Sequence, residues 1–90
     1  MVLCGGFSEI AVTDDGVVAA AAFAAAELAS LHGAIASHAI ESAASQVVAG
    51  VNYLIELSAT YESGDVKKHT VKVHRPLPHT GDPMKIMESN

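Results

Sequence analysis

Gln46-Val47-Val48-Ala49-Gly50 and the following Val51-Asn52-Tyr53-Leu54-Ile55-Glu56-Leu57 decide the fold of this chain. After the pentapeptide, apolar side chains recur at every second position, which is the period of a strand with one buried face. The segment before it has to reach the same sheet, so residues 47–50 are predicted to form the tip of a β-hairpin, a longer loop in which Gly50 supplies the freedom to turn. Two adjacent valines are unusual in an exposed turn, which indicates a contact surface.

The pentapeptide and the strand after it resemble the central loop and following strand of the cystatins, inhibitors of papain-like cysteine proteases. Gly5-Gly6-Phe7-Ser8-Glu9 is similar to the N-terminal glycine trunk of that family. Leu77-Pro78-His79 is similar to the second hairpin loop of the stefins, the small type 1 members without disulfides. The order of these motifs extends the resemblance from Gly5 to about Pro83.

The resemblance implies a reversible, competitive inhibitor of papain-like proteases such as papain and the cathepsins. It would act as a wedge that covers the active-site groove without offering a peptide bond to the catalytic thiolate. The glycine pair would allow close backbone approach, the valines and alanine of the tip would make the central apolar contact, and the second loop would contact the prime side. Gln46 is expected to fix the tip through hydrogen bonds. The implied protease-binding residues are Gly5, Gly6, Gln46, Val47, Val48, Ala49, Gly50, Leu77, Pro78 and His79.

The length of 90 residues predicts one domain over residues 1–90, with a thin core because Trp is absent and many apolar positions are alanine. Cys4 is the one cysteine, which excludes an internal disulfide and favours a reducing compartment. No signal peptide is visible, so a cytoplasmic location is expected. The apolar run over residues 17–26 is too short for a membrane span and ends at Glu27, so no membrane association is expected.

The net charge is −5, and four of the five basic residues lie at Lys67, Lys68, Lys72 and Arg75. This cluster is either a nucleic-acid patch or a solvated strand face whose lysines discourage sheet-to-sheet pairing. The negative net charge and the lack of interleaved aromatic residues favour the strand face, so no nucleic acid is expected as a partner.

A helix is predicted from about Val17 to His32, after a short N-terminal strand through Ile10 and Val12 that follows a mobile arm. Thr13 or Asp14 can cap its first amide groups, and Gly33 is a stop signal. Residues 34–45 show no clear period, and propensity alone would extend a second helix there. We nevertheless predict a strand, because the hairpin needs one and the cystatins have one.

Three further strands follow in the prediction. The strand Val51–Tyr61 would turn alternate side chains toward the helix, the strand Val66–Arg75 would have an apolar and a basic face, and Met84–Met87 would be a short closing strand. The predicted fold class is α+β and cystatin-like, with one long helix packed across a twisted antiparallel sheet of four to five strands.

No residue pattern indicates an enzyme, a metal site or a cofactor site. Cys4 has no neighbouring base to activate it, and the histidines lack the paired spacing of zinc ligands, so each is predicted to be a polar surface residue. The alternative function is a cystatin-fold interaction protein without a protease target. In that case the tip is a hinge, and a monomer would exchange its first half with a second copy to form a domain-swapped dimer.

Overall fold

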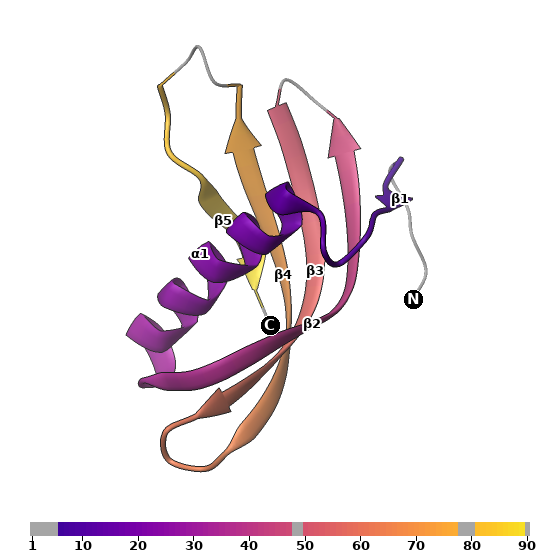
Figure 1. The fold of residues 1–90 in the computed structure, drawn as a ribbon. Coiled ribbons are helices and arrows are strands. Elements are labelled where there is room, and N and C mark those ends of the chain that lie inside the picture. The colour runs from indigo at the N-terminus through magenta and orange to yellow at the C-terminus, as the bar shows by residue number, and fades with distance from the viewer. Residues whose placement is uncertain (1–5, 48–49, 78–80, 90) are drawn as a thin grey trace.

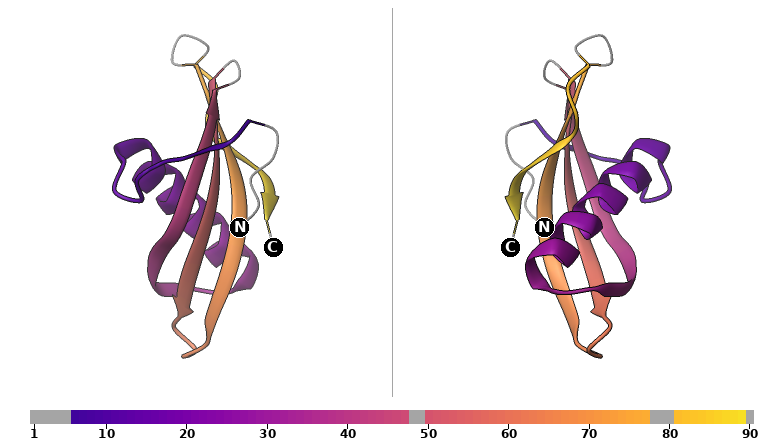
Figure 2. Two further views of the ribbon diagram at one scale, coloured as in Figure 1. Left: turned by 90° about the vertical axis from the view of Figure 1, so that its right-hand side faces the viewer. Right: turned by 90° about the vertical axis from the view of Figure 1, so that its left-hand side faces the viewer.

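The computed structural model describes residues 6–47, 50–77 and 81–89. The fold is α+β, with one helix, α1 (Asp15–His32), packed on a five-stranded antiparallel sheet. The strands are β1 (Ser8–Glu9), β2 (Ile35–Val47), β3 (Gly50–Tyr61), β4 (Val66–Pro76) and β5 (Lys85–Ser89). They follow one another in the sheet in chain order, and α1 covers one face of it (Figures 1 and 2).

The caps predicted from the sequence define the helix. The Asp14 carboxylate accepts hydrogen bonds from the amides of Gly16 and Val17 at 3.0 and 3.2 Å, so α1 begins two residues before the expected Val17. At the other end the Gly33 amide donates to the Ala29 carbonyl, with Gly33 at a φ of 112°. By length and composition only, α1 would also pass for a membrane span, a test that buried core helices pass as well.

The helix face that meets the sheet is made mostly of alanine. Ala20, Ala21 and Ala24 are fully buried, with Val17 and Leu28 at either end of the stripe. Because alanine side chains are short, the helix backbone lies close to the sheet. The sheet supplies the larger core side chains, which are Tyr53, Ile55, Leu57, Tyr61, Val71 and Val73. The thin core expected from the composition is therefore formed by bulky strands against a slim helix.

The predicted strand after the helix is confirmed, and its lack of period has a physical cause. β2 pairs with β3 along its length, but the register shifts between Ile35 and Ser37 and again between Ile40 and Ser42. Each shift inserts a residue into the strand and reverses the alternation of faces that follows it. A sequence with such irregularities cannot show an unbroken two-residue period.

Two details of the N-terminal half differ from expectation. The first strand is Ser8–Glu9, paired with β2, and not the predicted segment through Ile10 and Val12. The chain leaves the sheet after Ile10, where the amide of Asp14 bonds the carbonyl of Ala11 in a turn that leads into α1. The expected mobile arm is therefore held in the sheet at Ser8 and Glu9.

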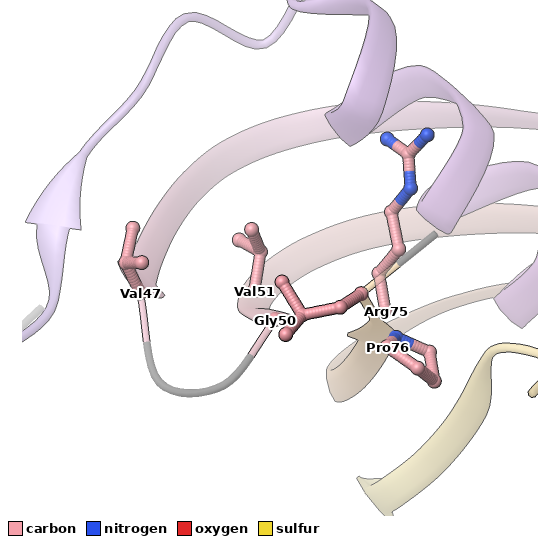
Figure 3. Close-up of a pocket in the computed structure, with 6 residues that line it drawn as sticks. Val47, Gly50, Val51, Arg75 and Pro76 are labelled. Atoms are coloured by element: carbon pink, nitrogen blue, oxygen red, sulfur yellow. The ribbon is translucent and has the colours of Figure 1, made fainter. Parts of the chain in front are cut away.

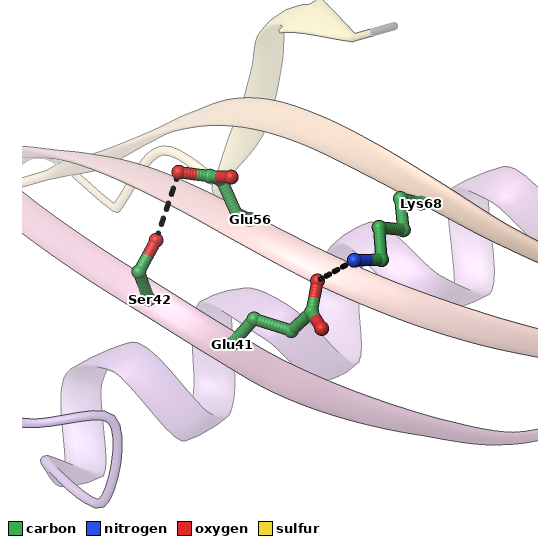
Figure 4. A network of polar contacts seen from close by, with 4 residues as sticks. All are labelled: Glu41, Ser42, Glu56 and Lys68. Atoms are coloured by element: carbon green, nitrogen blue, oxygen red, sulfur yellow. Dashed lines mark hydrogen bonds and ion pairs between the residues drawn. The ribbon is translucent and has the colours of Figure 1, made fainter. Parts of the chain in front are cut away.

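The face of the sheet opposite α1 is polar. On it Ser42 donates a hydrogen bond to Glu56 at 3.0 Å, and Lys68 lies 3.7 Å from Glu41 (Figure 4). The lysine side chain is 76% exposed, so this pair is solvated and contributes little to stability. By register Lys68 and Lys72 share this face, whereas Lys67 and Arg75 lie on the side of the sheet that faces α1, so the basic residues of β4 do not form one continuous patch.

One histidine prediction is wrong. His69 is only 7% exposed, and its Nε2 lies 2.9 Å from the hydroxyl of Tyr61 in a buried hydrogen bond. The ring of His32, at the end of α1, stacks on it with centroids 5.7 Å apart. His69 is two residues before Val71 and four before Val73, so the strand alternation places its side chain on the same buried face. The Tyr61 hydroxyl pairs with the ring nitrogen, which burial would otherwise leave without a hydrogen bond.

Candidate functional site

The first hairpin is tighter than the sequence indicated. β2 runs to Val47 and β3 begins at Gly50, with Gln46 opposite Asn52 and Val47 opposite Val51. Gln46, Val47 and Gly50 therefore belong to paired strands and not to a longer loop. Val48 and Ala49, which were predicted to make the central contact, lie outside the described residues.

The second predicted segment lies directly beside the first. In the β3–β4 pairing, Gly50 is opposite Pro76 and Val51 is opposite Arg75, so β4 ends where β3 begins. Leu77 follows β4 and is 39% exposed, whereas Pro78 and His79 lie outside the described residues. The strand ends that lead into both hairpin turns are thus at the same end of the sheet (Figure 1).

The N-terminal segment reaches the same end. Gly6 has a φ of 81°, and a methyl group added to it would lie 3.7 Å from Nε2 of Gln46. The next residue, Phe7, lies under the ammonium group of Lys72, which is 5.5 Å from its ring centroid. Gly6 is therefore placed against the first hairpin, while Gly5 lies outside the described residues.

The surface between the two hairpins is apolar and hollowed. A shallow depression of about 260 Å³ is lined by Val47, Gly50, Val51, Arg75, Pro76 and Leu77, and we call this surface the hairpin edge (Figure 3). Val47 is 82% exposed there, the highest exposed fraction among the large hydrophobic side chains of the described residues. An exposed valine at the rim of an apolar depression is typical of a surface that contacts another molecule.

Gly50 allows the two hairpins to approach each other. It is buried at a φ of 124°, and a Cβ atom there would lie 2.5 Å from the carbonyl oxygen of Arg75 and 3.2 Å from Cα of Pro76. Any other residue would be strained and would push β4 away. Gly50 was expected to permit the turn itself, but it is the first residue of β3, where both its positive φ and its contact with the neighbouring strand require glycine.

Three polar side chains support the hairpin edge from the face opposite α1, and two of them were missed in the sequence. Asn52 donates from Nδ2 to Oε1 of Gln46 at 3.2 Å, and its Oδ1 lies 2.6 Å from Nδ1 of His74. We call Gln46, Asn52 and His74 the polar row, because they occupy adjacent positions on β2, β3 and β4. The strand register brings these three side chains together, so their spacing along the chain does not reveal the cluster.

The chemistry that this arrangement offers is binding through shape and apolar contact. Within residues 6–47, 50–77 and 81–89, no three His, Cys, Asp or Glu side chains gather as metal ligands would. The same ranges hold no buried side-chain nitrogen or oxygen without a hydrogen-bond partner. No protein-family model and no curated protein matches the chain. What the described residues establish is the fold, one helix on a five-stranded antiparallel sheet, and an apolar edge at one end of that sheet.

Proposed function

We propose that the protein is a cystatin-like, stefin-type inhibitor of papain-like cysteine proteases, and that the hairpin edge is its protease-binding surface. The observation that carries the proposal is that the described residues of three sequence motifs meet at one end of the sheet. Gly6 lies beside Gln46, and Gly50 lies beside Pro76 and Leu77, although these segments are far apart in the chain. The order of a helix followed by an antiparallel meander agrees with the fold that the motifs imply.

The exposed groups suit entry into a narrow protease groove. Val47 and Leu77 project apolar surface, and the positions of β3 and β4 are held by strand pairing before any partner binds. A surface that is ordered in advance loses little conformational entropy on docking, so a small contact area suffices for tight binding. The hairpin edge would fill the groove and exclude substrate without being cleaved, which is competitive inhibition.

The direct test is titration of papain and of a cathepsin with the purified protein and with two matched variants. Val47→Asp places a carboxylate on the hairpin edge, and Val66→Asp makes the same change at a valine that is 63% exposed at the opposite end of the sheet. We expect Val47→Asp to raise the inhibition constant by more than about tenfold, because desolvating an unpaired carboxylate costs more than about 1.4 kcal/mol. Val66→Asp should inhibit like the unchanged protein.

Two results would contradict the proposal. If the unchanged protein inhibits neither enzyme at micromolar concentration, the inhibitor function is wrong, and self-association through Val47 becomes the better account of the exposed tip. If both variants weaken inhibition equally, while circular dichroism shows that they are folded, the protease contact lies elsewhere on the molecule.

A further inference from the structure

The polar row bears on which nitrogen of the His74 ring carries a proton. Asn52 uses its amide nitrogen to donate to Gln46, so its carbonyl oxygen is the atom that faces His74. An oxygen can only accept, so with Asn52 oriented in this way the 2.6 Å contact is a hydrogen bond only when Nδ1 of His74 carries a proton. The neutral tautomer protonated at Nδ1 and the imidazolium ion both meet this condition, whereas the neutral tautomer protonated at Nε2 does not.

Burial makes these hydrogen bonds consequential. Asn52 is 6% exposed, so its amide group depends on its neighbours in the protein for partners. Leaving a buried amide unpaired costs more than the bond itself contributes, which holds both partners in place. Gln46 and His74, on strands separated by β3, are thereby linked through one side chain.

The polar row touches both the N-terminal segment and the hairpin edge. At one end, Nε2 of Gln46 lies next to Gly6 of the N-terminal segment. At the other end, a Cβ atom on Gly50 would lie 3.3 Å from Cε1 of His74, so the imidazole ring packs against the start of β3. His74 is followed directly by Arg75 and Pro76, which line the depression.

We propose that His74 is a positioning residue for the hairpin edge. It orients Asn52, Asn52 orients Gln46, and the three together hold the N-terminal segment and both hairpins in one relative arrangement. The proposal deepens the inhibitor function proposed above and rests on it for its functional effect. Its structural part, the Nδ1 proton and the ordered edge, stands independently of any protease.

The first experiment therefore uses the protein alone. The ¹⁵N chemical shifts of the His74 ring, measured by NMR at about pH 8 where histidine is ordinarily neutral, identify the protonated nitrogen. We expect Nδ1 to be protonated. Backbone relaxation at Val47 and Gly50 should then show increased exchange in His74→Phe, which fills the ring volume without a donor, and recovery in His74→Asn, which supplies an amide donor near Nδ1. A ring protonated at Nε2, or unchanged relaxation in His74→Phe, would overturn the proposal.

The second experiment measures inhibition of papain. One neutral hydrogen bond has a net value of about 0.5–1.5 kcal/mol, so His74→Phe should raise the inhibition constant by about twofold to twelvefold, and His74→Asn should restore it. His38→Phe is the matched control, because His38 is an exposed histidine of β2. Gln46→Ala combined with His74→Phe should cost less than the sum of the single changes, since each alone already breaks the row.

The outcomes separate the two proposals. Additive effects of Gln46→Ala and His74→Phe would show that the residues act independently and would overturn the coupling. If the unchanged protein fails to inhibit but its His74 ring is protonated at Nδ1 and its edge is ordered by the row, the inhibitor function fails and the positioning role stands. If the ring lacks the Nδ1 proton and inhibition is normal, the positioning role fails and the inhibitor function stands.

Discussion

Gly50 carries two constraints at once, a left-handed backbone and contact with a neighbouring carbonyl. We expect Gly50→Ala to lower the free energy of unfolding by about 2–4 kcal/mol, because the strain at a positive φ is added to displacement of β4. Gly64→Ala is the matched control, since Gly64 also has a positive φ, 98°, but no atom lies within 4 Å of a Cβ placed on it. It should lose only about 1–2 kcal/mol.

Urea unfolding of both variants measures the difference. Equal losses would mean that the contact with Arg75 contributes nothing and that strain alone requires glycine. A larger loss in Gly50→Ala, with weaker inhibition of papain, would tie the approach of β3 and β4 to the proposed function.

At the same scale, single residues explain what the sequence could and could not predict. The backbone role of Gly50 was predictable, because few residue types other than glycine allow the chain to reverse direction. The inward position of His69 was also encoded, since it continues the alternation of Val71 and Val73, but its polarity favoured the surface in the prediction. The burial and hydrogen bonding of Asn52 were not predictable, because its partners Gln46 and His74 are placed beside it only by the strand register.

At the scale of the elements, the helix start offers a clean test. Asp14 accepts two amide hydrogen bonds, whereas the neighbouring Asp15 is exposed in the first turn of α1. We expect Asp14→Ala to destabilise the protein by about 1 kcal/mol and Asp15→Ala by a few tenths at most, because only the first change leaves amide groups without a cap. Thermal unfolding of the two variants measures this difference, and a larger loss in Asp15→Ala would contradict the assignment of the cap.

The alanine stripe of α1 gives a second prediction at this scale. Ala24 is fully buried against the sheet and Ala22 is exposed on the same helix. Alanine and leucine both favour helices, so Ala24→Leu and Ala22→Leu differ mainly in packing. We expect Ala24→Leu to cost about 1–3 kcal/mol through overpacking and Ala22→Leu to stay within about 0.5 kcal/mol. Similar unfolding midpoints would show that the helix can move away from the sheet freely.

The elements also differ in how well the sequence specified them. The helix was bounded within two residues because Asp14 and Gly33 act locally, through their own backbone neighbours. β2 was predicted from the need of a hairpin for a partner strand and from the resemblance to the cystatins, because its two register shifts remove the alternation. β1 was misplaced by a few residues, since a two-residue strand has too few positions to show any period.

For the whole molecule, the β2–β3 hairpin is the connection between the helical half and the β3–β5 half. If two copies exchanged these halves, β2 and β3 would join into one straight strand, and Val47 and Gly50 would no longer form a hairpin. We expect a dimer prepared by mild heating and isolated by size exclusion to inhibit papain less than the monomer. A dimer of full activity would place the hinge elsewhere or remove the hairpin from the protease contact.

The turn between β3 and β4 lies at the far pole of the molecule from the hairpin edge, and the longest dimension is 38 Å (Figure 1). Ser63 is exposed in this turn, and Gly64 closes it with a hydrogen bond to the carbonyl of Tyr61. A thiol introduced there by Ser63→Cys, with Cys4→Ser to keep the chemistry selective, would anchor the protein to a resin by the pole opposite the hairpin edge. Every attached copy would then display the hairpin edge outward, so the resin would capture binding partners through uniformly oriented copies.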